Sequence, residues 1–177
     1  MTGKIVALVD GSIYSHSVCE NAAWVAARTG AQIELLHVLG RRDSAEASDL
    51  SGSLALGARS ALLEELTQLD EQRAKLQQQR GRAILEDARA VIAAAGVTNV
   101  TARLLIGDIL ELAAESEADA EMIVIGKRGE AADFTGRHLG SNIERIVRAS
   151  HKPVFVAAPP FRAVSYHPLP LPTHLPL

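Results

Sequence analysis

The segment KIVALVDGS, residues 4–12, determines the fold expected for this chain. Lys4 to Val9 is an almost continuous apolar run, and Asp10-Gly11-Ser12 ends it with turn-forming residues. A strand that is apolar on both sides is typical of a parallel sheet covered by helices. Ser12 or Ser15 then caps a helix that ends at Thr29-Gly30.

Four further apolar runs follow at intervals long enough to hold a helix. These runs are Gln32–Val38, Thr98–Ile106, Met122–Ile125 and Pro153–Ala157. The alternation of strand and helix predicts an α/β fold with an open five-stranded parallel sheet, right-handed crossovers and helices on both faces. In such sheets ligands bind beyond the carboxyl ends of the strands.

Residues 58–95 form a helical pattern that is too long for a crossover. At about 1.5 Å per residue this helix would measure about 57 Å, so part of it must overhang the sheet. Leucines at positions 62, 66, 69 and 76 keep near-heptad spacing. A solvated helix with a bend near Gly81 is one interpretation, and a protein-partner surface is the other.

Bulk composition excludes several classes of function. Aromatic residues make up only 3% of the chain and the net charge is −3, which argues against nucleic-acid binding. No run is long enough for a membrane span, and the amino terminus has no signal-peptide core. Cys19 is the only cysteine, is expected to be buried, and agrees with a cytoplasmic location. The histidines show no metal-ligand spacing, so no metal site is predicted.

The strongest chemical signal lies between Gly126 and Ser141. Gly126-Lys127-Arg128-Gly129 follows the fourth strand, and Gly140-Ser141-Asn142 opens the last helix. Glycines let main-chain N–H groups gather around one anion, and a helix amino terminus adds partial positive charge, so this segment suits a phosphate. Alternatively, these glycines only form turns.

Two aspartates at strand ends have two interpretations each. The carboxylate of Asp10 suits either ribose or adenine, or it caps the first helix. Asp108 follows Gly107 directly before the helical pattern Ile109–Ala118, and capping is favoured there.

Together these segments resemble the universal stress protein family. The resemblance spans Lys4 to about Ala158 and rests on Val9-Asp10-Gly11-Ser12, Leu36-His37-Val38, Ile106-Gly107-Asp108 and the two glycine pairs. It implies a five-stranded parallel sheet and, for the branch with the glycine motif, an adenine nucleotide as ligand. ATP, carried with Mg²⁺, is the cofactor that the resemblance implies.

The resemblance assigns a role to each matching residue. Asp10 would hold adenine or ribose, and Val38 would line the adenine slot. The phosphates would lie on Gly126, Gly129, Gly140 and Ser141, with Ile125 and Asn142 supplying neighbouring backbone. One departure is the segment Glu130–Leu139, which is one residue longer than the family pattern.

The resemblance is strongest to the first half of tandem, two-domain members of the family. We expect residues 1–160 to form one such domain, followed by a Pro-rich tail over residues 161–177 that is disordered or docks a proline-binding partner. This domain is expected to pair with a second copy of itself through the edge strand near Val154–Ala157, as is common in this family.

The main functional hypothesis is a nucleotide-dependent stress-response and signalling module with an unidentified protein partner. Slow ATP hydrolysis or phosphotransfer is the alternative, and it is weakened because no Walker lysine motif or second acidic cluster is visible. A flavoprotein would need more aromatic residues near the strand ends. A phosphorylated receiver domain would need paired acids after the first strand, where only Asp10 stands.

Overall fold

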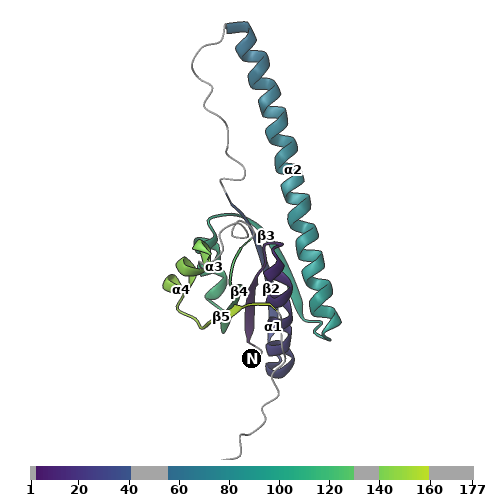
Figure 1. The fold of residues 1–177 in the computed structure, drawn as a ribbon, viewed down its shortest axis with the longest axis vertical. Helices are drawn as coiled ribbons and strands as arrows, with labels where there is room; N and C mark the ends of the chain where they lie inside the picture. Colours follow the sequence, from purple (N-terminus) through teal and green to yellow (C-terminus); the bar gives the residue numbers. More distant parts are fainter. Residues whose placement is uncertain (1–2, 41–55, 130–139, 160–177) are drawn as a thin grey trace, which may run out of the picture.

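The computed structural model describes residues 3–40, 56–129 and 140–159, with backbone alone for residues 56–61 and 141. Strands and helices alternate along the described chain (Figure 1). They are β1 (Lys4–Leu8), α1 (Ile13–Thr29), β2 (Gln32–Gly40), α2 (Leu56–Ala94), β3 (Val100–Gly107), α3 (Ile109–Glu117), β4 (Met122–Gly126), α4 (Ser141–Ala149) and β5 (Val154–Ala157).

The five strands form one parallel sheet in the order β3-β2-β1-β4-β5. The chain first moves outward from β1 through β2 to β3, and then returns to the other side of β1 as β4 and β5. The direction of winding therefore reverses between β1 and β4, where Leu8 pairs with Ile125. In open α/β sheets a crevice forms at the carboxyl ends of the strands at this reversal.

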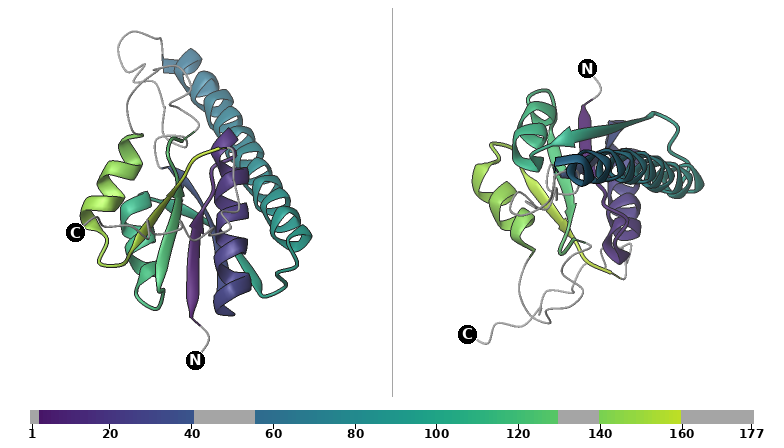
Figure 2. Two further views of the ribbon diagram at one scale, coloured as in Figure 1. Left: turned by 60° about the horizontal axis from the view of Figure 1, so that its bottom comes forward. Right: turned by 90° about the horizontal axis from the view of Figure 1, so that it is seen from above.

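Helices cover both faces of the sheet, as the sequence predicts. α1 and α2 lie on one face, and α3 and α4 lie on the other (Figure 2). Successive side chains of β1 point to opposite faces of the sheet. Ile5 and Ala7 pack beneath α1 and α2, whereas Val6 and Leu8 pack towards α3 and α4. This division explains why β1 shows an apolar run instead of an alternating pattern.

Capping interactions define the start of α1 and the end of α2. Ser12 is the N-cap of α1, and its hydroxyl accepts a hydrogen bond from the Tyr14 N–H. After α2, Gly96 adopts a left-handed conformation (φ 84°), and the Val97 N–H donates to the Ile92 carbonyl in a Schellman arrangement. Since this turn occupies the residues up to Val97, β3 starts at Val100 and not at Thr98.

The long helix α2 projects beyond the carboxyl edge of the sheet (Figure 1). Its carboxyl-terminal half packs on α1, β2 and β3, with Leu85, Ala88 and Ile92 in the core. The helix continues unbroken through Gly81. Close packing explains the glycine better than a bend does, because a Cβ there would lie 2.7 Å from Leu104 Cδ1 and 2.9 Å from His37 Cδ2. Among the described helices, none combines the length and apolarity that a membrane crossing requires.

Candidate functional site

A network of hydrogen bonds fixes Asp10 at the carboxyl end of β1. Oδ1 of Asp10 accepts hydrogen bonds from the Ser12 N–H (3.0 Å) and the Ser15 hydroxyl (3.1 Å). The same Ser15 oxygen accepts from the N–H groups of Asp10 and Gly11, at 3.1 Å each. Because Ser12 caps α1, Asp10 is not the N-cap; its carboxylate instead braces the turn that leaves β1.

The loop after β4 passes directly beside this carboxylate. A Cβ added to Gly129 would lie 2.8 Å from Asp10 Oδ2, closer than side-chain carbons approach in folded proteins. A Cβ added to Gly126 would lie 2.7 Å from the Cβ of Tyr14 on α1. Glycine at both positions therefore permits a close approach between the β4 loop and the β1 turn.

The second glycine pair lies against the first. Gly140 stands next to the Arg128-Gly129 backbone, with its would-be Cβ 3.5 Å from the Gly129 nitrogen, and its N–H donates to the Lys127 carbonyl at 3.5 Å. The positive φ angles in the described chain belong to Gly11, Gly30 and Gly96, so none of these three glycines needs a left-handed conformation. At Gly126 and Gly129 the missing side chain permits the close approach, whereas a Cβ at Gly140 would make ordinary van der Waals contacts.

The N-cap residue of α4 offers no side-chain acceptor to the first turn of the helix. Gly140 is the N-cap and supplies no side-chain hydrogen bond, so the first-turn N–H groups have no capping hydroxyl or carboxylate from that residue. Glu144, the acid of this first turn, is paired with Arg148 at 2.9 Å. Asn142 is exposed, and the side chain of Ser141 lies outside the description.

The apolar wall of the site comes from the carboxyl ends of β2 and β4. Val38 is half-buried and Ile125 is buried, and both belong to the cluster under α3 and α4. Beside them, Nδ1 of His37 lies 2.7 Å from the Val9 carbonyl oxygen, so the ring nitrogen must donate its proton there. This contact joins the ends of β1 and β2.

Asp108 has the capping role that the sequence favours. Its Oδ1 accepts from the Leu110 N–H at 2.8 Å, and its Oδ2 pairs with Arg145 of α4 at 3.3 Å. The helix N–H and then Arg145 hold the pKa of this carboxyl below its usual value. Cys19 is buried as expected, and burial raises the pKa of its thiol to about 12.

Among the predicted site residues, the structure brings together Asp10, Gly126, Gly129 and Gly140. From the sequence, Ser15 is singled out only as a possible helix cap, and Tyr14 and Ile84 are not singled out. Ile84 of α2 packs on the β1 turn, because its Cδ1 lies 2.7 Å from where a Gly11 Cβ would be. Ser15, a hydroxyl residue in the first turn of α1, could have been recognised from the sequence as a hydrogen-bond partner of the β1 turn, whereas no sequence pattern indicates Tyr14 or Ile84. The segment that is one residue longer than the family pattern, residues 130–139, lies outside the described residues.

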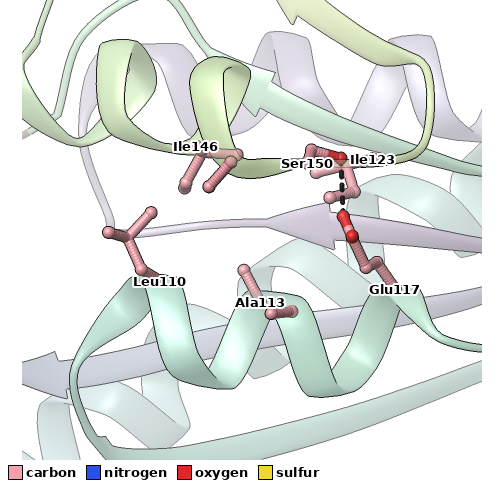
Figure 3. A pocket seen from close by; sticks show the side chains of 8 residues that line it. Leu110, Ala113, Glu117, Ile123, Ile146 and Ser150 are labelled. Carbon is pink, nitrogen blue, oxygen red and sulfur yellow. Dashed lines mark hydrogen bonds between the residues drawn. The ribbon is translucent and has the colours of Figure 1, made fainter.

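A pocket lies between α3 and α4 (Figure 3), but it cannot hold a nucleotide. It is lined mainly by apolar side chains such as Leu110, Ala113 and Ile146, and its free space of about 10 Å³ is close to that of one water molecule. At one end the Ser150 hydroxyl donates to Glu117 at 2.5 Å. We interpret it as a packing gap beneath the two helices.

Comparison with known proteins identifies the family. A model described as "Universal stress protein family" matches residues 1–158. The chain belongs to this family. Universal stress protein Slr1230 of Synechocystis is 34% identical over 164 residues, which cover 92% of this chain and 57% of that protein. The chain therefore spans little more than half the length of that relative.

Solved universal stress protein structures share the fold. UspA from Lactobacillus plantarum aligns with a TM-score of 0.60 at 19% identity, covering 88% of this chain and 97% of the other. A family member in complex with cAMP gives 0.57 at 21% identity over 88% and 96%. The Archaeoglobus fulgidus protein in complex with dAMP gives 0.54 at 19% identity over 89% and 98%. At these identities the likeness establishes the fold.

Proposed function

We propose that this chain binds an adenine nucleotide, ATP with Mg²⁺, at the reversal point between β1 and β4. The observation that carries the proposal is the close packing of three glycines: Gly129 lies beside Asp10 of the β1 turn, Gly126 beside Tyr14 of α1, and Gly140 beside Gly129. The backbone of the β4 loop thus lies next to the start of α4, whose N-cap Gly140 has no side-chain acceptor, and this supports a phosphate group there.

Each end of the nucleotide has a proposed partner. Asp10 and Val38 would hold ribose and adenine, with Ile125 completing the apolar wall. Gly126, Gly129, Gly140, Ser141 and Asn142 would hold the phosphates. The cations Lys127 and Arg128 lie in the loop between the first two glycines, where they oppose the negative charge of the phosphates. The cAMP and dAMP carried by two structural relatives support an adenine nucleotide as the ligand class.

Nucleotide binding is proposed to act as a stress-response signal and not to drive rapid chemistry. A ligand changes a partner surface only through different affinities for two conformations, and α2 touches the β1 turn through Ile84. The proposal includes a cytoplasmic location and a domain over residues 1–160 with a tail over 161–177, although residues 160–177 lie outside the described residues. Slow ATP hydrolysis is the alternative, and phosphate release under saturating ATP tests it directly.

ATP is expected to raise the melting temperature of the protein in proportion to the logarithm of its concentration. A ligand that binds only the folded state stabilises it by about 2.7 kcal/mol at a hundredfold excess over its Kd. Parallel titrations with ATP, ADP, AMP and cAMP measure how much each phosphate group contributes to the shift in melting temperature. The β- and γ-phosphates should contribute most, because the glycine backbones would contact mainly these two groups. If none of the four nucleotides shifts the melting temperature, the proposed function is wrong.

The edge strand β5 is the proposed homodimer contact. Phe155 and Val156 are 38% and 41% exposed, and in the described sheet β5 pairs with β4 alone. An exposed apolar edge strand favours pairing with another strand. A lysine at Val156 is expected to lower the average mass of the associated protein in sedimentation velocity, whereas the exposed-site control Glu115→Lys should not. A mass distribution of Val156→Lys equal to that of wild type contradicts this contact.

A further inference from the structure

Residues 62–80, the part of the α2 overhang whose side chains are described, include no buried side chain. Every residue from Leu62 to Arg80 is exposed or half-buried, whereas Gly81 is buried and Leu85, Ala88 and Ile92 belong to the core. Despite this exposure the segment is rich in leucine: Leu63, Leu69 and Leu76 are 55%, 54% and 65% exposed. Large exposed apolar side chains gathered on one segment typically mark an interaction surface.

Four leucines of the overhang lie along one side of the helix. Their positions, 62, 66, 69 and 76, are separated by four, three and seven residues. In a heptad these are positions d, a, d and d, and the stripe faces a partner helix in a coiled coil. Arg73 and Arg80 occupy the remaining a positions. The sheet-facing side chains Leu85, Ala88 and Ile92 lie further along the helix, so the stripe and the core contact are separate surfaces.

Charge along residues 62–82 of α2, which follow Arg59, is divided into two halves of opposite sign. Residues 62–71 contain only acidic charged side chains, at Glu64, Glu65, Asp70 and Glu71. Residues 72–82 contain only basic ones, at Arg73, Lys75, Arg80 and Arg82. The helix macrodipole does not account for this division, because its effect is confined to the terminal turns and α2 runs from Leu56 to Ala94.

We propose that the overhangs of two copies of this chain pair as an antiparallel coiled coil through residues 62–80. In that orientation the acidic half of each helix meets the basic half of the other, and both contacts occur twice about a two-fold axis near Glu71. Leu66 then lies opposite Leu76 of the partner subunit. A parallel pair would instead place acid against acid and Arg73 against Arg73 of the partner subunit, so electrostatics selects the antiparallel pair.

Cysteine cross-linking tests the orientation. Leu66→Cys and Leu76→Cys are ten residues apart on the helix, about 15 Å. An equimolar mixture of the two variants is expected to form an intermolecular disulfide under mild oxidation, whereas each variant alone forms at most a tenth as much. Cys19 does not compete, because it is buried. Efficient cross-linking of each variant with itself would mean a parallel pair, and no cross-linking in the mixture would mean no pair; either result overturns the proposal.

Charge exchange tests the partner without altering the leucines. Glu65→Lys/Asp70→Lys and Arg73→Glu/Lys75→Glu each place like charges against one another, so each alone should reduce the affinity between the overhangs at least tenfold. Mixing the two variants should restore association as a heterodimer. A double change on α3, Glu111→Lys/Glu115→Lys, is the matched control and should have no effect. Full association of either charge variant alone would contradict the proposal.

Both tests are performed on the full chain carrying Val156→Lys. Pairing through β5 is then weakened, and the remaining association reports on α2. Circular dichroism confirms that each variant keeps its helix content; all the altered charges are exposed in the structure. These results do not depend on nucleotide, so a failure here leaves the proposed ATP site standing.

Discussion

The variant Gly129→Val is expected to abolish the rise in melting temperature that ATP produces. A Cβ at this position lies 2.8 Å from Asp10 Oδ2. The carboxylate cannot retreat freely, because the Ser12 N–H and the Ser15 hydroxyl hold its other oxygen. The β4 loop must therefore move away, which separates the glycine backbones proposed to hold the phosphates. At a hundredfold excess of ATP, a stabilisation of about 2.7 kcal/mol would fall close to zero.

The matched control for this variant is Gly30→Ala. Gly30 has a left-handed φ of 73° and no neighbour within 4 Å of an added Cβ, so alanine introduces backbone strain without a steric collision. We expect a loss of roughly 1 kcal/mol of stability together with a normal ATP response. Differential scanning fluorimetry across an ATP series measures both variants. If Gly129→Val responds to ATP as fully as wild type, the phosphate site lies elsewhere.

The variant Ile92→Ala is expected to lower the free energy of unfolding by about 2–5 kcal/mol, as large-to-small changes in cores do. Ile92 is 0% exposed and belongs to the cluster between α2 and the sheet. Its carbonyl also accepts the Val97 N–H that ends the helix, but alanine leaves this main-chain bond in place. The loss therefore reports on packing alone, and urea denaturation measures it.

A leucine on the same helix provides the control for this second prediction. Leu63 is 55% exposed on the overhang, and Leu63→Ala should change stability by at most about 0.5 kcal/mol. Dilute protein keeps association between overhangs from contributing. Comparable losses in the two variants would mean that the overhang belongs to the folded core, contrary to the structure.

Local patterns predicted most of the fold. Apolar runs such as Lys4–Val9 identify strands covered on both sides, and capping residues such as Ser12 and Gly30 mark the ends of α1. The helical pattern over 58–95 and its overhang are confirmed by α2. The predicted start of β3 was less accurate, because a Schellman turn follows α2. The strand therefore begins at Val100 and not at Thr98.

The site was predicted less completely because its geometry joins distant segments. The sequence indicated glycines suited to phosphate, but the reason for two of them is a contact partner: Asp10 for Gly129 and Tyr14 for Gly126. The supporting contacts of His37 with the Val9 carbonyl and of Ile84 with the Gly11 turn also cross between elements. No local periodicity encodes such pairs.

By itself, the sequence determined the class of fold, the family and the list of glycine and acidic residues at the strand ends, because hydrophobic periodicity, turn chemistry and motif spacing are local properties of the chain. Tertiary structure alone decided that β1 and β4 are neighbours. It also decided that Gly140 lies against Gly129, and that Gly81 is where α2 comes into contact with His37 and Leu104 of the sheet. These facts depend on which strands pair and how closely backbones pack, and those are set by the burial of side chains from all the elements together.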